Sequence, residues 1–376
     1  MISNFYENPY VMISSIIFLF FILYVVCVFF FNIQRKINIL SLIFLYSSLI
    51  LISAYTNPYD TDDLTRYYYW INEFRFLNLS IFESYAPFPF LSKVILKFIS
   101  FFPYNFFLQV FIIITILTVV FLILYLEFNF ELNSKSSLYL LSLLAVLSLY
   151  ISVSGIRFNL SISLSSIFLV LLVRRNISLF IYLVLITLMS LIHIVSAIFF
   201  LIILVKLLVY SRKQNYIYIL PFIVYAFTFL MLNINFSDFP IIDEIQSRFY
   251  TYYQSNLISS SFFRNLGYFF YIFSIFLFLT SNKEIKGSRL LDNFILVLIS
   301  IALSTYFIIP ELFYRLISII SLLSFSPIKS YFNRTKSFNF YRTLISYKLF
   351  LFQMGIIILL FYEFINYYRD WMFYTL

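Results

Sequence analysis

Apolar segments long enough to cross a lipid bilayer recur along the whole chain. A transmembrane helix needs about 17–25 mainly apolar residues, and runs of this kind extend from Val11–Phe31 to Leu349–Asn366. Hydrophobic residues are 63% of the 376 residues and charged residues 11%, whereas soluble domains average about 45–50% and about 25%. The sequence therefore predicts an all-α polytopic integral membrane protein with about twelve transmembrane helices, forming one multi-spanning membrane domain over residues 1–376.

Two long polar segments interrupt the apolar pattern, at about residues 55–104 and 233–261. If the connection at Arg35 and Lys36 is cytoplasmic, alternate connections on that side receive most of the 25 basic residues and a minority of the 16 acidic ones. By the positive-inside rule, both long segments are then exoplasmic. The net charge of +9 is explained by cytoplasmic loops and does not indicate a nucleic-acid partner. Lys93 and Lys97 lie one turn apart, which predicts an interfacial or re-entrant helix over Phe90–Phe102.

Arg157 stands between two apolar runs, Leu138–Val153 and Ile162–Val173. An arginine at the edge of the hydrocarbon region costs about 2.5–3.5 kcal/mol unless it reaches water or a partner. If both runs are helical, Arg157 begins the second one, and Ser161 and Ser165 follow it at helical spacing. A cation above a hydroxyl stripe suits an anionic ligand, while the structural alternative is an arginine that anchors a helix end.

The densest polar cluster is Asn57-Pro-Tyr-Asp-Thr-Asp-Asp-Leu-Thr-Arg-Tyr-Tyr-Tyr-Trp70. Its carboxylates, Asp62 and Asp63 among them, and Arg66 could bind sugar hydroxyls, hold a divalent ion or provide a general base. Tyr67 and its aromatic neighbours suit stacking on sugar rings, or an interfacial aromatic belt. The alternative for the whole cluster is a solvated acidic loop.

His193 is the only histidine, and it falls at the predicted turn between two short apolar runs. Histidine can exchange a proton near neutral pH, so His193 is a candidate general base beside the structural alternative. Cys27 is the only cysteine, which excludes an intramolecular disulfide. The sequence has no phosphate-binding loop, dinucleotide fingerprint or zinc motif, so we predict no cofactor and no metal site.

Two further arginines lie beside tyrosines on the predicted exoplasmic side, in Arg248-Phe-Tyr-Thr-Tyr-Tyr253 and in Glu311-Leu-Phe-Tyr-Arg315. Arginine pairs bidentately with phosphate oxygens, which makes Arg248 and Arg315 candidate diphosphate ligands, with Tyr252 beside the substrate sugar. The alternative for Arg315 is a salt bridge with Glu311 one turn earlier.

Taken in order, these motifs resemble the EpsG-like branch of the Wzy polysaccharide polymerases. The resemblance rests on Asp63-Leu-x-Arg-Tyr-Tyr68, on Gly155-x-Arg-x-x-Leu-Ser161, on His193, and on the arginine–tyrosine motifs at Arg248 and Arg315. Phe158 stands where this family often has glutamine. The resemblance implies an inverting glycosyltransferase of the bacterial inner membrane, with its active site facing the periplasm and an architecture comparable to the GT-C glycosyltransferases.

The same resemblance implies the roles of the site residues. The substrates would be undecaprenyl-diphosphate-linked glycans, polymerised into O-antigen or a related surface polysaccharide. Arg157, Arg248 and Arg315 would hold the diphosphate, and His193 or Asp63 would deprotonate the acceptor. Asp62, Arg66, Tyr67 and Tyr252 would bind the acceptor sugar. Expected partners are membrane lipids and a chain-length regulator.

Two other functions fit part of the pattern. A glycosyltransferase that uses a polyprenyl-phosphate sugar also carries acidic residues in its first exoplasmic loop. A lipid-linked oligosaccharide flippase or other transporter would need charges within its spans, broken helices or internal repeats. The interior of the predicted spans is nearly free of charge, so the sequence favours the enzyme.

Overall fold

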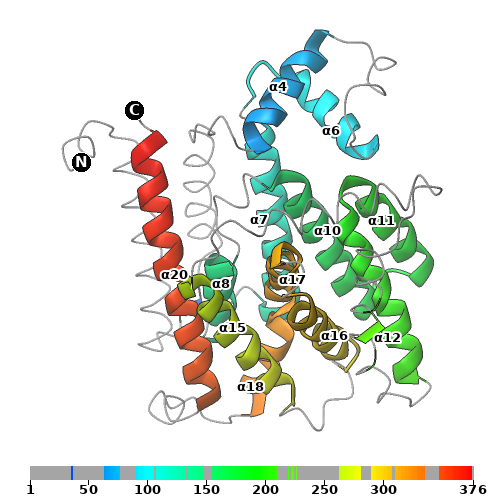
Figure 1. Ribbon diagram of the computed structural model, residues 1–376. Coiled ribbons are helices and arrows are strands. Elements are labelled where there is room, and N and C mark those ends of the chain that lie inside the picture. Colours follow the sequence, from blue (N-terminus) through cyan, green and yellow to red (C-terminus); the bar gives the residue numbers. More distant parts are fainter. Residues whose placement is uncertain are drawn as a thin grey trace. The chain divides into compact units, whose positions relative to one another are not determined.

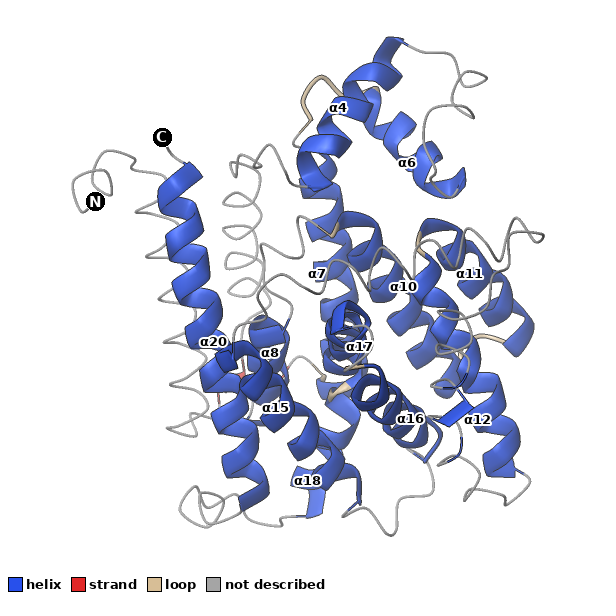
Figure 2. Cartoon of the chain, in the orientation of Figure 1, coloured by secondary structure: helices blue, strands red, loops and turns tan. Residues whose placement is uncertain are grey.

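The computed structural model (Figure 1) describes residues 35–36, 63–76, 90–105, 107–129, 131–132, 134–146, 155–210, 219, 222–223, 226, 262–280, 289–306, 310–334 and 347–374. Nearly all of these residues are helical, as Figure 2 shows. The described residues also include one short pair of antiparallel β-strands, β1 (Arg35–Lys36) and β2 (Glu131–Leu132). The all-α fold class is therefore confirmed for the described part of the chain.

The chain divides into two compact units, Met1–Phe200 with Glu363–Leu376, and Leu201–Tyr362. The first unit contains β1, β2 and the following helices: α4 (Asp63–Phe76), α6 (Phe90–Ser100), α7 (Phe107–Phe128), α8 (Ser134–Val146), α10 (Ile156–Val173), α11 (Leu179–Ile192) and the 3₁₀ helix η2 (Ile194–Phe200). The second unit contains α12 (Leu201–Tyr210), α15 (Phe262–Thr280), α16 (Arg289–Thr305), α17 (Pro310–Leu323), α18 (Phe325–Arg334) and the larger part of α20 (Tyr347–Tyr374).

Two helices in the described ranges are long and apolar enough to cross a membrane, judged by length and composition. They are Val110–Phe128, which forms most of α7, and Phe262–Thr280, which is α15. Shorter apolar helices include Arg157–Val173 and Leu179–Ile192. Several large apolar side chains on α7 are exposed, Ile114 and Leu122 among them, which is the surface that a membrane-embedded helix presents to lipid. Predicted spans such as Val11–Phe31 lie outside the described residues.

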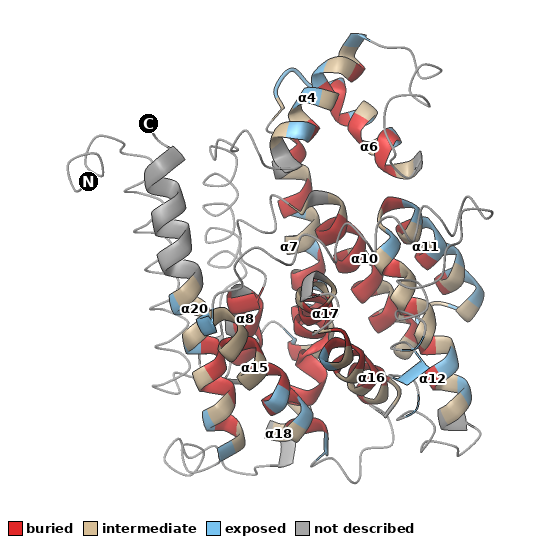
Figure 3. Ribbon diagram, in the orientation of Figure 1, coloured by how far each residue is buried: buried red, intermediate tan, exposed pale blue. Residues whose placement is uncertain are grey.

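Helix α10 is the central helix of the first unit and lies against α7, α11 and η2. It is buried around most of its circumference (Figure 3), although it carries several serines. Ser161 and Ser165 are fully buried, because small side chains let neighbouring helices approach closely. The prediction that Arg157 begins this helix is confirmed. The hydroxyl stripe below it faces helix packing, so it does not line an open site.

Helix α4 forms inside the segment that was expected to be a polar loop, whereas α6 confirms the helix predicted over Phe90–Phe102. Tyr67, Ile71 and Phe74 recur at helical spacing on α4, and all three are buried against α6 and the start of α7. An interfacial helix over α6 was expected to expose its lysines and bury its apolar residues, but the structure shows the opposite. Lys93 is buried and Lys97 half-buried, whereas the outer face carries apolar residues such as Phe98, which is exposed.

In the second unit, α15 and α20 approach each other closely at two glycines. A Cβ on Gly267 would lie 2.8 Å from the Cγ of Leu359, and a Cβ on Gly355 would lie 2.8 Å from the backbone nitrogen of Tyr271. These distances leave no room for a side chain at Gly355, since its neighbour there is backbone. A small residue at a helix crossing is a common way for apolar helices to associate in membranes.

Candidate functional site

The guanidinium group of Arg157 is held by a tyrosine from a distant part of the sequence. Arg157 is the second residue of α10 and is half-buried. Its Nε–H donates a hydrogen bond to the hydroxyl of Tyr67 on α4, at 2.7 Å. The guanidinium carbon lies 5.8 Å from the centre of the Tyr67 ring, because the contact is made through the hydroxyl at the end of the ring. Two motifs separated by 90 positions are thus joined.

Tyr67 itself has little freedom to move. Its side chain is 3% exposed, and its ring meets that of Trp70 edge to face at 5.5 Å. The resemblance implies that Tyr67 binds the acceptor sugar. In this structure its ring is buried and its hydroxyl accepts the hydrogen bond from Arg157.

A second arginine fixes α4 so that Tyr67 can reach α10. Arg75, in the last turn of α4, donates hydrogen bonds to the carbonyl oxygens of Ser100 at 3.3 Å and Phe102 at 2.9 Å. It also donates to the side-chain oxygens of Asn72 at 2.8 Å and Asn105 at 3.0 Å. Arg75 therefore connects α4 to the turn between α6 and α7.

Lys97 of α6 strengthens the same connection. Its Nζ donates to the carbonyl oxygen of Phe74 in the last turn of α4. Cations near the C-terminus of a helix are favoured, since the free carbonyl groups there carry partial negative charge. Lys97 and Arg75 thus act on the same end of α4, and Tyr67 lies at its other end.

His193 lies at the turn between α11 and η2, as the sequence predicts. It caps the C-terminus of α11, where its backbone N–H donates to the carbonyl oxygen of Met189 at 2.9 Å. Its ring nitrogen Nδ1 accepts a hydrogen bond from the N–H of Val195 at 3.2 Å. Its carbonyl oxygen accepts from the N–H of Ser196 at 3.0 Å, which starts the 3₁₀ turn.

These contacts decide which nitrogen of His193 can take part in proton transfer. An Nδ1 that accepts a hydrogen bond is unprotonated, so the proton of the neutral ring is assigned to Nε2. In this geometry the neutral imidazole presents a donor at Nε2 and cannot accept a proton there. The role of His193 as general base therefore stays a prediction.

The same histidine is connected to the arginine through one residue of α10. The ring of Phe158 meets that of His193 edge to face, with 5.5 Å between the ring centres and 70° between the planes, and Phe158 directly follows Arg157. On the other side, the Ser92 hydroxyl of α6 donates to the carbonyl oxygen of Ile192 at 2.9 Å. Tyr67, Arg157 and His193 are thus joined by a continuous series of contacts within the first unit.

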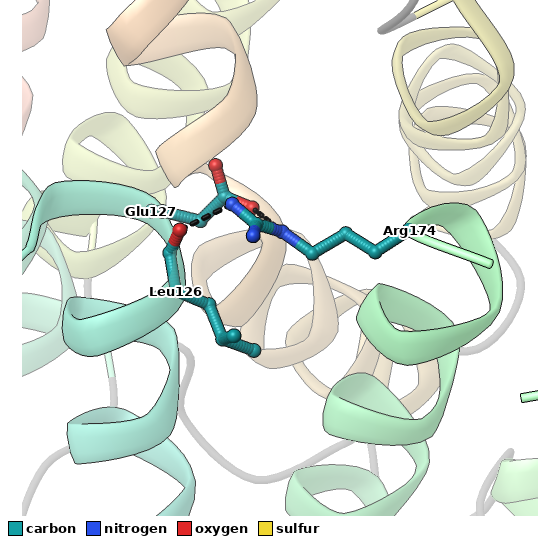
Figure 4. Close-up of polar contacts among 3 residues, drawn as sticks. All are labelled: Leu126, Glu127 and Arg174. Atoms are coloured by element: carbon teal, nitrogen blue, oxygen red, sulfur yellow. Dashed lines mark hydrogen bonds and ion pairs between the residues drawn. The ribbon is translucent and has the colours of Figure 1, made fainter. Parts of the chain in front are cut away.

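The other end of α10 is anchored by an ion pair (Figure 4). The Nε of Arg174 lies 2.9 Å from Oε1 of Glu127 at the end of α7, and the same guanidinium donates to the carbonyl oxygen of Leu126. Arg174 is partly exposed and Glu127 is mostly covered. The position of Arg157 is therefore fixed from both ends of the helix.

The remaining predicted site residues are spread over the chain. Asp62, Arg248 and Tyr252 lie outside the described residues. Asp63 is the first residue of α4 and precedes Tyr67 by four positions, which is about one helical turn. Arg66 is exposed on α4, and Arg315 is half-buried in α17 of the second unit.

Arg264, which the sequence did not single out, lies near two tyrosine rings. Arg264, the third residue of α15, lies with its guanidinium carbon 4.3 Å from the centre of the Tyr314 ring and 5.6 Å from that of Tyr268. The Tyr314 hydroxyl donates to Oδ1 of Asn265 at 2.6 Å. In the sequence, Arg264 lies near the start of an apolar run, and Tyr268 follows it one helical turn later. This spacing is the signal that could have identified the arginine.

In the described parts of the chain, no group of three or more His, Cys, Asp or Glu residues is placed to hold a metal ion. Comparisons with protein families, with curated proteins and with solved structures found no match to this chain.

Proposed function

We propose that this protein is a membrane-embedded glycosyltransferase that polymerises glycan units carried on undecaprenyl diphosphate, on the periplasmic face of the bacterial inner membrane. The observation that carries the proposal is the Arg157–Tyr67 pair at the start of the apolar helix α10. A positively charged group at the end of an apolar helix is suited to a lipid whose charged head lies at the membrane surface.

Electrostatics support the same assignment. The first turn of α10 contains no acidic residue, so the partial positive charge of the helix N-terminus adds to that of Arg157. A guanidinium group is suited to phosphate oxygens, because it can donate two parallel hydrogen bonds to them. Arg248 and Arg315 are proposed as further diphosphate ligands.

The reaction exchanges one bond to the anomeric carbon for another. The hydroxyl oxygen of the acceptor sugar attacks the anomeric carbon of the donor chain from the side opposite the diphosphate, so the configuration inverts. The bond from that carbon to the diphosphate oxygen breaks, and undecaprenyl diphosphate leaves with the electron pair. Arginines stabilise the charge that develops on this leaving group.

The acceptor hydroxyl must lose a proton during the attack. His193 or Asp63 is the proposed base. The Nδ1 of His193 already accepts a hydrogen bond from Val195, so we favour Asp63, at the start of α4, and propose that His193 places Arg157 through Phe158. Asp62, Arg66 and Tyr252 are proposed to bind the acceptor, and a chain-length regulator and membrane lipids are proposed partners.

The experiment is complementation of a deletion strain, with glycan length read from a gel. Arg157→Ala should leave only single repeat units while the protein still reaches the membrane. The matched control is Arg175→Gln, an exposed arginine just beyond the other end of α10, which should support normal ladders. Normal ladders from Arg157→Ala would contradict the diphosphate role. Full ladders lacking a branch sugar in the deletion strain would instead identify a polyprenyl-phosphate-sugar transferase.

A further inference from the structure

The second unit contains an apolar cavity between α15 and α16. Its volume is about 480 Å³, within the range of about 300–1,000 Å³ that is typical of small-molecule sites. The lining is almost wholly apolar and includes Phe269, Phe273 and Phe276 of α15 and Leu303 of α16. Phe273 and Leu303 are exposed, at 51% and 41%, so the cavity opens at the surface of the unit as a groove.

A polar group lies directly above this groove on the same helix face. Asn265, Phe269, Ile272 and Phe276 follow one another at spacings of four, three and four residues, which places them in one row along α15. By the rise of an α-helix, Asn265 is about 6 Å above Phe269 and Phe276 is about 10 Å below it. The groove therefore has a polar end and an apolar length.

The polar end carries positive charge in a fixed position. The guanidinium carbon of Arg264 lies 4.3 Å from the centre of the Tyr314 ring, and this contact with the ring face holds the charge in position. The Tyr314 hydroxyl binds the Oδ1 of Asn265 at 2.6 Å, so the other end of that amide, its NH₂ group, is a donor only.

We propose that the groove and its polar end form a binding site for a polyprenyl diphosphate, with one isoprenoid chain along α15 and α16 and the diphosphate at Arg264 and Asn265. The guanidinium group supplies positive charge and the amide supplies further N–H donors, which together match a diphosphate head group. A single groove between two helices holds one hydrocarbon chain. It therefore suits an isoprenoid lipid better than a phospholipid with two acyl chains. The choice of a polyprenyl ligand rests on the proposed function, in which two lipid-linked substrates must be held.

The test uses the purified full-length chain in detergent and a photoreactive farnesyl diphosphate. Cross-linked peptides should come from α15 and α16, and labelling should be outcompeted by farnesyl diphosphate. Pyrophosphate and farnesol should each compete at least tenfold more weakly, since each satisfies only one end of the site. Labelling confined to α4 and α10, or equally strong competition by phosphatidylglycerol or by pyrophosphate alone, would overturn the proposal.

Variants separate the two ends of the site. Arg264→Gln should weaken farnesyl diphosphate binding about tenfold or more, and Ser300→Phe should block the chain by filling the groove. Lys348→Gln, at the start of α20, is the control and should bind as the wild type does. Unchanged affinity in both site variants would refute the site. If a variant misfolds by gel filtration, the cross-linking map of the wild-type chain decides the question.

The outcome is independent of the glycan assay. Labelling in the groove with unaltered ladders in the deletion strain would retain this site and reject the polymerase. Ladders lost on deletion, together with labelling elsewhere, would retain the polymerase and reject this site.

Discussion

An arginine is held by a tyrosine at the start of an apolar helix in each of the two units, but the two pairs are built differently. Arg157 of α10 donates Nε–H to the hydroxyl of Tyr67 at 2.7 Å. Arg264 of α15 lies 4.3 Å above the centre of the Tyr314 ring. The first contact depends on an oxygen atom and the second on an aromatic face.

This difference determines what each arginine can do. A hydrogen bond through Nε fixes the direction of the guanidinium and uses one of its donors, whereas contact with a ring face holds the position of the charge through the ring's electrons. Neither α10 nor α15 has an acidic residue in its first turn, so both helix ends are suited to anions. Removing a hydroxyl should therefore damage the first pair, and removing a ring should damage the second.

The largest effect is expected when the support of the first pair is removed. Arg75→Leu deletes hydrogen bonds to Ser100, Phe102 and Asn105, each worth about 1.5–3 kcal/mol to a charged donor when buried. Since the site is partly exposed, we expect a loss of about 3 kcal/mol in the local stability of α4. Amide hydrogen exchange in residues 63–76 should accelerate strongly. Exchange rates like those of the wild type would show that α4 is held by apolar contacts alone.

The next effect concerns the hydroxyl of Tyr67. Tyr67→Phe keeps the buried ring and removes the acceptor of the Arg157 hydrogen bond, which is worth about 1.5–3 kcal/mol for a charged donor. Chain growth, measured as the rate of ladder formation, should fall about tenfold or more. The exposed Tyr69 provides the control, since Tyr69→Phe should leave the rate unchanged. A rate within twofold of the wild type for Tyr67→Phe would remove its positioning role.

A smaller effect is expected from the glycine contact behind α15. A Cβ at Gly355 would lie 2.8 Å from the nitrogen of Tyr271, and overpacking of this kind costs about 1–3 kcal/mol. Alanine recovers about 1 kcal/mol in helix propensity. Gly355→Ala should therefore lower the thermal stability of the protein slightly and weaken binding at Arg264. Ile357→Ala, at an exposed position of the same helix, should not weaken that binding.

The smallest effect is expected at the second pair. Tyr314→Phe keeps the ring below Arg264 and removes only the bond to Asn265, so the affinity for farnesyl diphosphate should fall less than about threefold. Tyr314→Leu removes the ring and should cost more, since cation–π contacts contribute about 0.5–2 kcal/mol. Equal losses in the two variants would mean that the hydroxyl, and not the stack, holds Arg264.

The sequence predicts the features that depend on local pattern. Arg157 marks a helix start and His193 a helix end because each interrupts an apolar run, and the structure places both at those boundaries. The helix at Asp63–Phe76 was expected as a loop, because its buried stripe of Tyr67, Ile71 and Phe74 is diluted by charged residues.

Features that depend on distant partners are not visible in the sequence. The inward direction of Lys97 follows from the position of Phe74 on another helix, and the buried state of Ser165 follows from the neighbours of α10. Arg264 was counted as part of an apolar run, and only Tyr314, 50 positions later in the chain, shows how it is held. Partners of this kind come from tertiary packing.

The central claim is that Tyr67 acts through Arg157, and a double-mutant cycle on chain growth tests it most directly. Arg157→Lys keeps the positive charge and should leave measurable activity, although lysine lacks the planar guanidinium group with its paired N–H donors. If the claim holds, Tyr67→Phe costs about tenfold in the wild-type background and close to nothing in the Arg157→Lys background. Equal losses in both backgrounds would show that Tyr67 and Arg157 act independently, and would contradict the account.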